Sequence, residues 1–344
     1  MLYQLPAILL TLIIITSSLS QSPIEQLKQD INQEIYPNID GIVVMKNKKI
    51  IIEEYFNDFD RDRLHDTRSS FKSITSILAG IAIDQGLFTV DDSLDKFFSK
   101  WENDPRGKIK IKDLLEMKSG LACENFFGIG PDCESEMWET DDWIGFILDI
   151  PIRHDPGLNW DYTSVEPMLV GEIISRTSKM SIMDFAAQYL FDPLEIEDYK
   201  WTISPKGKGM SAGSFYMRPI DMLKIAQLVQ YEGLWDNQRI VSQKWMKKST
   251  DCRTDVEMSF VRFSRLKNAK YSTARYGYYW YQEVLQYENI NTKVTFASGN
   301  GGQYMMILDD FNAVIVFTGS NYGNWRGKLP FVILMKYLIP IIEN

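Results

Sequence analysis

Residues 68–75 read Arg-Ser-Ser-Phe-Lys-Ser-Ile-Thr, and they stand between a predicted strand hairpin and a hydrophobic helix. We expect this helix over about 69–86, because its apolar residues recur at the spacing of a buried helical face and Gly86 then ends it. Ser69 and Lys72 lie three residues apart at the start of the helix, so their side chains share one face, one turn apart. The stretch therefore places a hydroxyl beside an amine at a helix N-terminus.

These two side chains fit a serine nucleophile and its base. A serine hydroxyl attacks poorly until a neighbouring base removes its proton, and a lysine held neutral by burial or by nearby cations can be that base. At the helix N-terminus, the backbone N–H of Ser69 could also bind a developing oxyanion. The same spacing fits a serine that caps the helix and a lysine in solvent, so the pattern alone leaves both interpretations open.

The scarcity of histidine restricts the possible chemistry. The chain has 344 residues but only two histidines, His65 and His154, both in polar loops where we expect them to be exposed to solvent. Two histidines cannot form a three-histidine zinc site, and the three cysteines include no Cys-x-x-Cys pair. We therefore predict no metal or other cofactor. The net charge of -9 argues against a nucleic-acid partner, which would need a basic face.

The N-terminal segment has the composition of a signal peptide. Residues 1–20 carry no charged side chain, include an apolar run over 7–16 and end in small residues before Gln21. This pattern predicts a secretory signal, with an uncleaved N-terminal anchor as the alternative. The run is about half of the roughly 20 residues that span a bilayer, so we expect no stable membrane span after its removal. Residues 21–344 would then form one exported domain, periplasmic or extracellular.

The cysteines are consistent with export. Cys123 and Cys133 lie ten residues apart in a loop rich in glycine, proline and acidic residues. They could form a disulfide in an oxidising compartment, and two free thiols are the alternative. Cys252 would be left over, and we expect it to be buried and unreactive.

Strand-like segments occur at both ends of the chain, and helical segments fill the region of about 91–250. The economical arrangement is one antiparallel sheet built from both chain ends, flanked by helices and carrying a mostly helical insert. The fold class is then α/β (α+β). The expected strands cover 41–45, 49–56, 276–285, 294–298, 304–308 and 313–318, and the clearest helices besides 69–86 cover 22–35, 164–177, 181–191 and 326–342.

A second candidate segment, residues 157–164, reads Gly-Leu-Asn-Trp-Asp-Tyr-Thr-Ser and leads into a predicted helix. A tyrosine can accept or deliver a proton when cations lower its pKa, so Tyr162 is a candidate proton carrier. Ser164 could reach the same cleft. An aromatic side chain packed in the core, followed by a serine helix cap, is the alternative interpretation.

A third segment, residues 296–303, reads Phe-Ala-Ser-Gly-Asn-Gly-Gly-Gln and joins two predicted strands. Glycine lets a backbone pass close to a ligand. A strand edge beside the nucleophile could supply a second oxyanion N–H and pair with an extended substrate. An ordinary glycine-rich hairpin turn is the alternative. A phosphate-binding loop does not fit, because its lysine-serine ending is absent.

In this order, the three segments resemble the serine β-lactamase/penicillin-binding-protein superfamily. The resemblance is strongest to the branch of class C β-lactamases, esterases and 6-aminohexanoate-dimer hydrolases. It covers about residues 40–320 and implies a β-lactamase/transpeptidase-like fold. Shorter phrases that support it are Leu-Glu-Met-Lys-Ser-Gly-Leu (115–121), Pro-Gly (156–157), Leu-Phe-Asp-Pro-Leu (190–194), Ala-Gly (212–213) and Tyr-Gly-Tyr-Tyr-Trp (276–280).

The resemblance implies a role for each candidate residue. Ser69 becomes the acylated nucleophile with Lys72 as its base partner, and Tyr162 matches the tyrosine of the family's Tyr-x-Asn motif. The family's asparagine is Ser164 here. The family's Lys-Thr-Gly motif falls on Ala297, Ser298 and Gly299, and it is followed by Asn300, whose N–H would complete the oxyanion site, and by Gly301.

Two departures from the family pattern bear on the substrate. Ala297 lacks the cation that helps β-lactamases and transpeptidases bind a substrate carboxylate, and Ser164 replaces an amide that contacts the acylamide side chain. Both weaken an antibiotic-hydrolysing function but leave acylation possible. We therefore expect an exported serine hydrolase acting on a small ester, amide or peptide. The alternatives are a D-amino-acid peptidase or penicillin-binding-type cell-wall enzyme, and a catalytically silent peptide-binding relative.

Overall fold

The structure is a computed structural model, and it describes residues 22–123 and 132–343. The predicted signal peptide, residues 1–20, lies outside the described residues. Among the residues described, no helix is both long enough and apolar enough to cross a bilayer.

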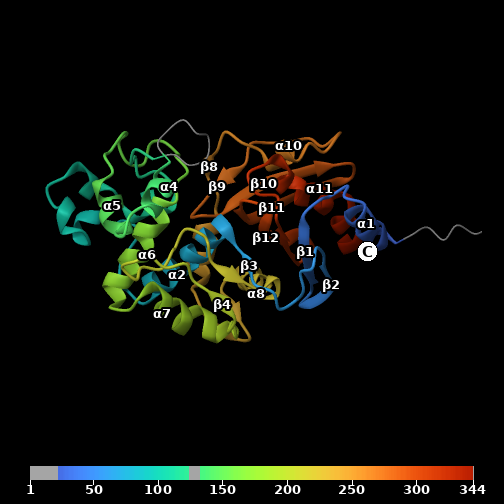
Figure 1. Ribbon diagram of the computed structural model, residues 1–344, viewed down its shortest axis with the longest axis horizontal. Coiled ribbons are helices and arrows are strands. Elements are labelled where there is room, and N and C mark those ends of the chain that lie inside the picture. The colour runs from blue at the N-terminus through green and yellow to red at the C-terminus, as the bar shows by residue number, and fades with distance from the viewer. Residues whose placement is uncertain (1–21, 124–131, 344) are drawn as a thin grey trace, which may run out of the picture.

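An eight-stranded antiparallel sheet forms the centre of the molecule, and strands from both ends of the chain meet within it (Figure 1). The first strand of the N-terminal hairpin pairs with the C-terminal strand, and Val43 lies opposite Val316. The strand order is β2-β1-β13-β12-β11-β10-β9-β8. The strands are β1 (Ile39–Lys46), β2 (Lys49–Tyr55), β8 (Thr254–Asp255), β9 (Arg275–Tyr276), β10 (Tyr281–Tyr287), β11 (Ile290–Gly299), β12 (Gln303–Leu308) and β13 (Ala313–Gly319).

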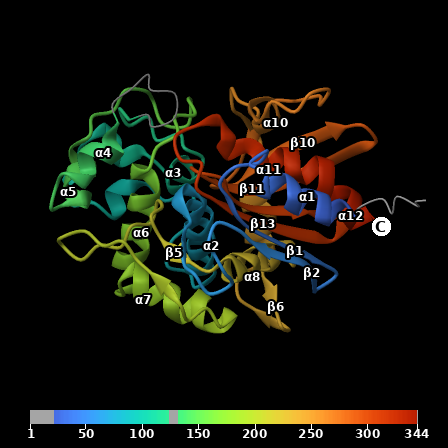
Figure 2. The ribbon, with the colours of Figure 1, turned by 45° about the vertical axis from the view of Figure 1, so that its right-hand side comes forward.

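Helices cover the sheet, and every residue of β12 and β13 is buried as a result. Helix α8 (Pro219–Gln230) packs against both of these strands. Figure 2 shows α1 (Pro23–Asn32), α11 (Leu329–Ile333) and α12 (Ile339–Glu343) lying together in front of the sheet. A sheet covered on both faces can use continuous apolar strands, which explains the runs in β12 and β13.

The region of about 91–250 is mainly helical, and its teal and green part forms the lobe on the left of Figure 1. Helix α6 is central to it, because α2, α3, α5 and α7 all pack against it. Short strands also occur there, and β5 joins β3 and β4 in a second, three-stranded sheet. Two elements come before this region, β3 (His65–Asp66) and α2 (Phe71–Asp84). Within it the helices include α3 (Ile111–Leu115), α4 (Cys133–Trp138), α5 (Trp143–Asp149), α6 (Val165–Ser178), α7 (Ile182–Ala186) and α9 (Gln243–Thr250), and the strands are β4 (Tyr199–Lys200), β5 (Tyr216–Met217), β6 (Leu234–Trp235) and β7 (Gln238–Arg239).

The single strand predicted over 276–285 is wrong in detail, because residues 277–280 separate β9 from β10. Tyr279 has a φ of 63°, in the left-handed region that an extended strand does not use. A Cβ on Gly277 would come within 2.5 Å of the Ser249 carbonyl oxygen. The chain therefore leaves the sheet to pack against the end of α9.

The prediction of an exposed His65 is also wrong, because only 3% of this residue is accessible. Its Nε2 lies 3.0 Å from Asp40 Oδ2, and its ring packs against Phe59 with centroids 5.0 Å apart. Asp40 belongs to β1, so the partner that allows burial lies 25 residues away. The polar sequence around His65 contains no sign of that pairing.

Candidate active site

The first candidate pair lies where α2 begins. Ser69 belongs to a single helical turn, Arg68–Ser70, that leads directly into α2, and Lys72 lies in the first turn of α2. Arg68 has a left-handed φ of 48°, which is unusual for a residue with a side chain. Asp66 holds it there, since Asp66 Oδ1 accepts from Arg68 N at 2.8 Å and Oδ2 lies 2.9 Å from Arg68 Nε. The turn that presents Ser69 is thus fixed by an adjacent carboxylate.

Lys72 is buried, with 2% of the residue accessible. Its Nζ donates to Ser69 Oγ at 3.1 Å, to Ser164 Oγ at 3.1 Å and to the Ala212 carbonyl at 2.7 Å. The same ammonium lies 5.1 Å from the centre of the Tyr162 ring. The structure therefore brings four predicted residues together: Ser69, Lys72, Tyr162 and Ser164.

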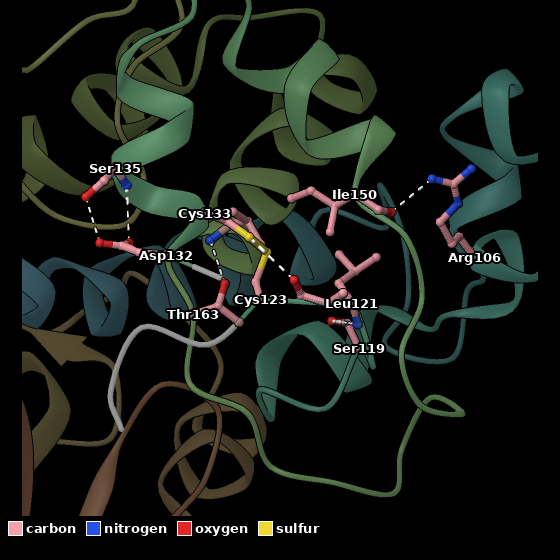
Figure 3. Close-up of a disulfide and its surroundings, with 11 residues drawn as sticks. Arg106, Ser119, Leu121, Cys123, Asp132, Cys133, Ser135, Ile150 and Thr163 are labelled. Carbon is pink, nitrogen blue, oxygen red and sulfur yellow. Dashed lines mark hydrogen bonds between the residues drawn. A yellow bond between two sulfur atoms is a disulfide. The ribbon is translucent and has the colours of Figure 1, made fainter. Parts of the chain in front are cut away.

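A fifth polar residue, which no sequence motif marks, joins this group. Ser164 Oγ donates to Glu134 Oε2, and Glu134 is the second residue of α4. Cys133, immediately before it, forms a disulfide with Cys123, with the two Cα atoms 5.7 Å apart (Figure 3). The disulfide and Glu134 thus lie next to each other in the chain. The position beside Cys133 was the only sequence signal that could have pointed to Glu134.

These residues border a cleft with a volume of about 610 Å³. Ser69, Tyr162 and Glu134 line one part of it, and Ser298 and Asn300 from the end of β11 line another. Aromatic side chains contribute to its apolar wall. They are Phe260, Phe263, Tyr281 and Trp325.

The glycine-rich segment passes close to the nucleophile turn. A Cβ on Gly299 would come within 2.5 Å of the Thr67 carbonyl oxygen, so only glycine lets β11 approach this turn so closely. Gly301 has a φ of 99° and lies against the Tyr322 ring. Neither glycine lines the cleft, and both shape the backbone around Asn300. Ala297 is fully buried.

A cation that no sequence motif marks also lines the cleft. Lys328 is half-buried at the end of a short helical turn, Trp325–Lys328, and its Nζ lies 4.3 Å from the centre of the Phe260 ring. Burial lowers the pKa of Lys328 to about 8, against a smaller raising effect from the Glu283 carboxylate. No pattern in the sequence distinguished this lysine from the other surface lysines.

Another buried carboxyl, Glu166, belongs to the frame of the site. Its Oε1 accepts from Ser119 N at 2.9 Å, and burial raises its pKa well above the usual range. Ser119 falls in the phrase over 115–121 noted above, and Glu166 lies in the first turn of α6. The pair therefore ties the start of α6, directly after Ser164, to the loop at 119.

Comparison with known proteins identifies the family of the chain. The model of the Beta-lactamase family matches residues 39–329. N-acetylmuramyl-L-alanine amidase of Bacillus subtilis (strain 168) is 23% identical over 133 residues, a match that covers 36% of the chain and 30% of that protein. The chain spans about a third of the length of the curated relatives it matches.

Solved structures share the fold over nearly the whole chain. A protein of Bacillus anthracis assigned as a 6-aminohexanoate-dimer hydrolase superposes with a TM-score of 0.72 at 14% identity, covering 93% of this chain and 83% of the other. A class C beta lactamase from Rhodobacter sphaeroides gives a TM-score of 0.67 at 12% identity, covering 93% and 99%. The fold and the predicted resemblance are both confirmed. The chain belongs to the beta-lactamase family and has the fold of its serine hydrolases.

Proposed function

We propose that the protein is a serine hydrolase that cleaves a small ester or amide through an acyl-enzyme on Ser69. The observation that carries the proposal is the 3.1 Å contact between Lys72 Nζ and Ser69 Oγ at the edge of a cleft. A serine hydroxyl needs a base within hydrogen-bond reach to become a nucleophile, and the described residues around Ser69 offer this amine.

In the acylation step, Ser69 Oγ attacks the carbonyl carbon of the substrate while its proton passes to Lys72 Nζ. The backbone N–H groups of Ser69 and Asn300 hold the oxyanion that forms, and Ser298, Gly299 and Gly301 shape the strand end that presents the second N–H. Lys72 and Tyr162 return the proton to the departing alcohol or amine. Water then attacks the ester on Ser69 and loses a proton to the same groups, which pass it to Ser69 Oγ as the acid is released.

An aliphatic ester or amide is the preferred substrate class. Position 297 carries a methyl group that is fully buried, so it offers no charge to a substrate carboxylate. The apolar wall of Phe260, Phe263 and Trp325 suits an uncharged acyl chain. Amide bonds of cell-wall peptides are the second candidate, favoured by the partial similarity to the amidase of Bacillus subtilis.

The proposal also covers the cellular context. Residues 1–20 would direct export and be removed, leaving residues 21–344 as the enzyme in the periplasm or the extracellular space. The disulfide between Cys123 and Cys133 supports this location, because disulfides persist in oxidising compartments. The partner is a small molecule rather than a nucleic acid or a membrane.

Hydrolysis of p-nitrophenyl acetate and butyrate by the wild type and by Ser69→Ala tests the proposal. We expect the wild type to release p-nitrophenol and Ser69→Ala to fall to the uncatalysed rate. Ser93→Ala is the matched control, because Ser93 contacts Asp95 and does not line the cleft. Equal turnover by the wild type and Ser69→Ala would disprove the assignment of the nucleophile.

A further inference from the structure

Glu134 is connected to the lysine beside the nucleophile through one hydroxyl group. Lys72 Nζ donates to Ser164 Oγ at 3.1 Å, and Ser164 Oγ donates in turn to Glu134 Oε2. We propose that Glu134 is a positioning residue that accepts, through Ser164, the proton Lys72 must lose before it can act as the base for Ser69. This inference rests on the function proposed above.

The acceptors around Lys72 limit where its proton can go. Lys72 Nζ donates to three oxygens of the described residues. One is the backbone carbonyl of Ala212, which holds the ammonium but does not take up its proton. Ser69 is the group to be deprotonated. Ser164 is the acceptor whose own hydroxyl leads on to a carboxylate. The path from Lys72 to Glu134 therefore runs through Ser164.

Burial explains why such a path is needed. Lys72 is almost completely buried, and among the described residues no carboxylate oxygen lies within ion-pair distance of its Nζ. A buried ammonium that has hydrogen bonds but no ion-pair partner is costly to desolvate. Glu134 supplies a carboxylate one hydroxyl away, so the proton can leave Lys72 without leaving the site.

The transfer conserves protons and charge. A proton of the Lys72 ammonium moves to Ser164 Oγ as the hydroxyl proton of Ser164 moves to Glu134 Oε2. An ammonium and a carboxylate become an amine and a carboxylic acid, and Ser164 ends as it began. The amine of Lys72 is then able to take the proton of Ser69 when Oγ attacks. Reversal of the relay restores the starting state after the product leaves.

The residue types along the path suit this task. A hydroxyl can accept one hydrogen bond and donate another, whereas an amide at position 164 has no single atom that does both. Glu134 is fixed in place from its own element, because the preceding residue, Cys133, is buried and tied to Cys123. Asp132 caps the same helix by accepting from Ser135 N (Figure 3).

Three variants separate proton acceptance from simple hydrogen bonding. Glu134→Gln keeps an oxygen that accepts from Ser164 but cannot take up the proton, whereas Glu134→Asp keeps the carboxylate on a shorter side chain. Glu136→Gln is the matched control, since Glu136 is exposed two residues further along α4. The readout is the rate at which Ser69 is labelled by an alkyl fluorophosphonate, followed by intact mass.

We expect Glu134→Gln to be labelled about tenfold or more slowly than the wild type, Glu134→Asp to recover part of that rate, and Glu136→Gln to match the wild type. A merely structural hydrogen bond would give the opposite order, with Gln tolerated and Asp impaired. Labelling of Glu134→Gln at the wild-type rate, or faster than Glu134→Asp, would overturn the relay. Thermal melts identify any variant that has lost its fold, and the two remaining variants still rank the rates.

A double-mutant cycle tests the route through Ser164. In a Ser164→Ala background the path is already cut, so Glu134→Gln should slow labelling by less than about twofold further. If Glu134→Gln slows labelling by the same factor in the wild type and in the Ser164→Ala background, the route through Ser164 is contradicted. If the wild type is not labelled, or Ser69→Ala is labelled equally, the proposed function fails, and the relay falls with it. Failure of the relay alone leaves Ser69-dependent labelling intact.

Discussion

Gly299 lies against the residue two positions before the nucleophile, since a Cβ added to it would stand 2.5 Å from the Thr67 carbonyl oxygen. This contact brings the end of β11 to the turn that carries Ser69. The predicted oxyanion site depends on it, because Asn300 follows Gly299 directly. The relationship joins the C-terminal part of the sheet to the N-terminus of α2.

Gly299→Ala should therefore separate β11 from the Ser69 turn. We expect kcat/KM for p-nitrophenyl butyrate to fall by about tenfold or more and the free energy of unfolding to fall by about 1–3 kcal/mol. Gly327→Ala is the control, because its Cβ would meet no atom closer than 3.4 Å. Full activity of Gly299→Ala would show that the close approach is not needed for catalysis.

The methyl group at position 297 predicts weak activity toward β-lactams. Ala297 is buried and uncharged, so no cation at this position orients a substrate carboxylate. We expect little or no turnover of nitrocefin under conditions in which p-nitrophenyl butyrate is hydrolysed. Rapid nitrocefin hydrolysis that Ser69→Ala abolishes would contradict this interpretation of Ala297.

The cysteines should separate into one disulfide and one unreactive thiol. Reduction of the Cys123–Cys133 bond adds two hydrogens, so the intact mass should rise by about 2 Da with reductant. Cys252 is buried, and burial raises its pKa, so it should react slowly with iodoacetamide until the protein is unfolded. An unchanged mass, or rapid alkylation of three cysteines in the native protein, would exclude the disulfide.

Glu283 should make the fold less stable as the pH rises. Burial raises the pKa of its carboxyl to about 7, so between about pH 4.5 and 7 the folded state binds a proton that the unfolded state releases. Stability is therefore highest below this window and declines through it, by roughly 3–4 kcal/mol at most. Urea unfolding at pH 5 and pH 8 measures the difference.

Glu283→Gln should flatten that pH dependence, while the exposed Glu257→Gln should leave it as in the wild type. The amide oxygen can keep the hydrogen bond that Glu283 Oε2 accepts from Phe260 N at 2.8 Å, and the NH2 group in place of Oε1 can donate to Ser259 Oγ. If the free energy of unfolding of Glu283→Gln differs between pH 5 and pH 8 by as much as in the wild type, the pH dependence belongs to other groups.

The architecture follows from local patterns in the sequence. Continuous apolar runs mark β1 and β13, and the turn at Asn47 and Lys48 adopts the positive φ angles of a tight hairpin. Helix periodicity marks α2. The break between β9 and β10 could not be predicted, because it depends on a contact between Gly277 and the carbonyl of Ser249 across the fold.

The candidate site also contains residues that could be predicted from the sequence and residues that could not. Ser69 and Lys72 are visible in sequence because one helical turn connects them, and Ser164 follows from its position in a motif. Glu134 and Lys328 reach the cleft from segments that carry no motif, and only tertiary packing brings them there. His65 was misplaced for the same reason, since Asp40 pairs with it from another strand.

The most direct test of the account is the mass of the covalent adduct on Ser69. The protein is mixed briefly with p-nitrophenyl butyrate, quenched in acid and digested, and the peptide that contains Ser69 is weighed. The account predicts a butyryl group on Ser69 in the wild type and none in Ser69→Ala. An acyl group on another residue, or turnover with no adduct on Ser69 and no effect of Ser69→Ala, would contradict it.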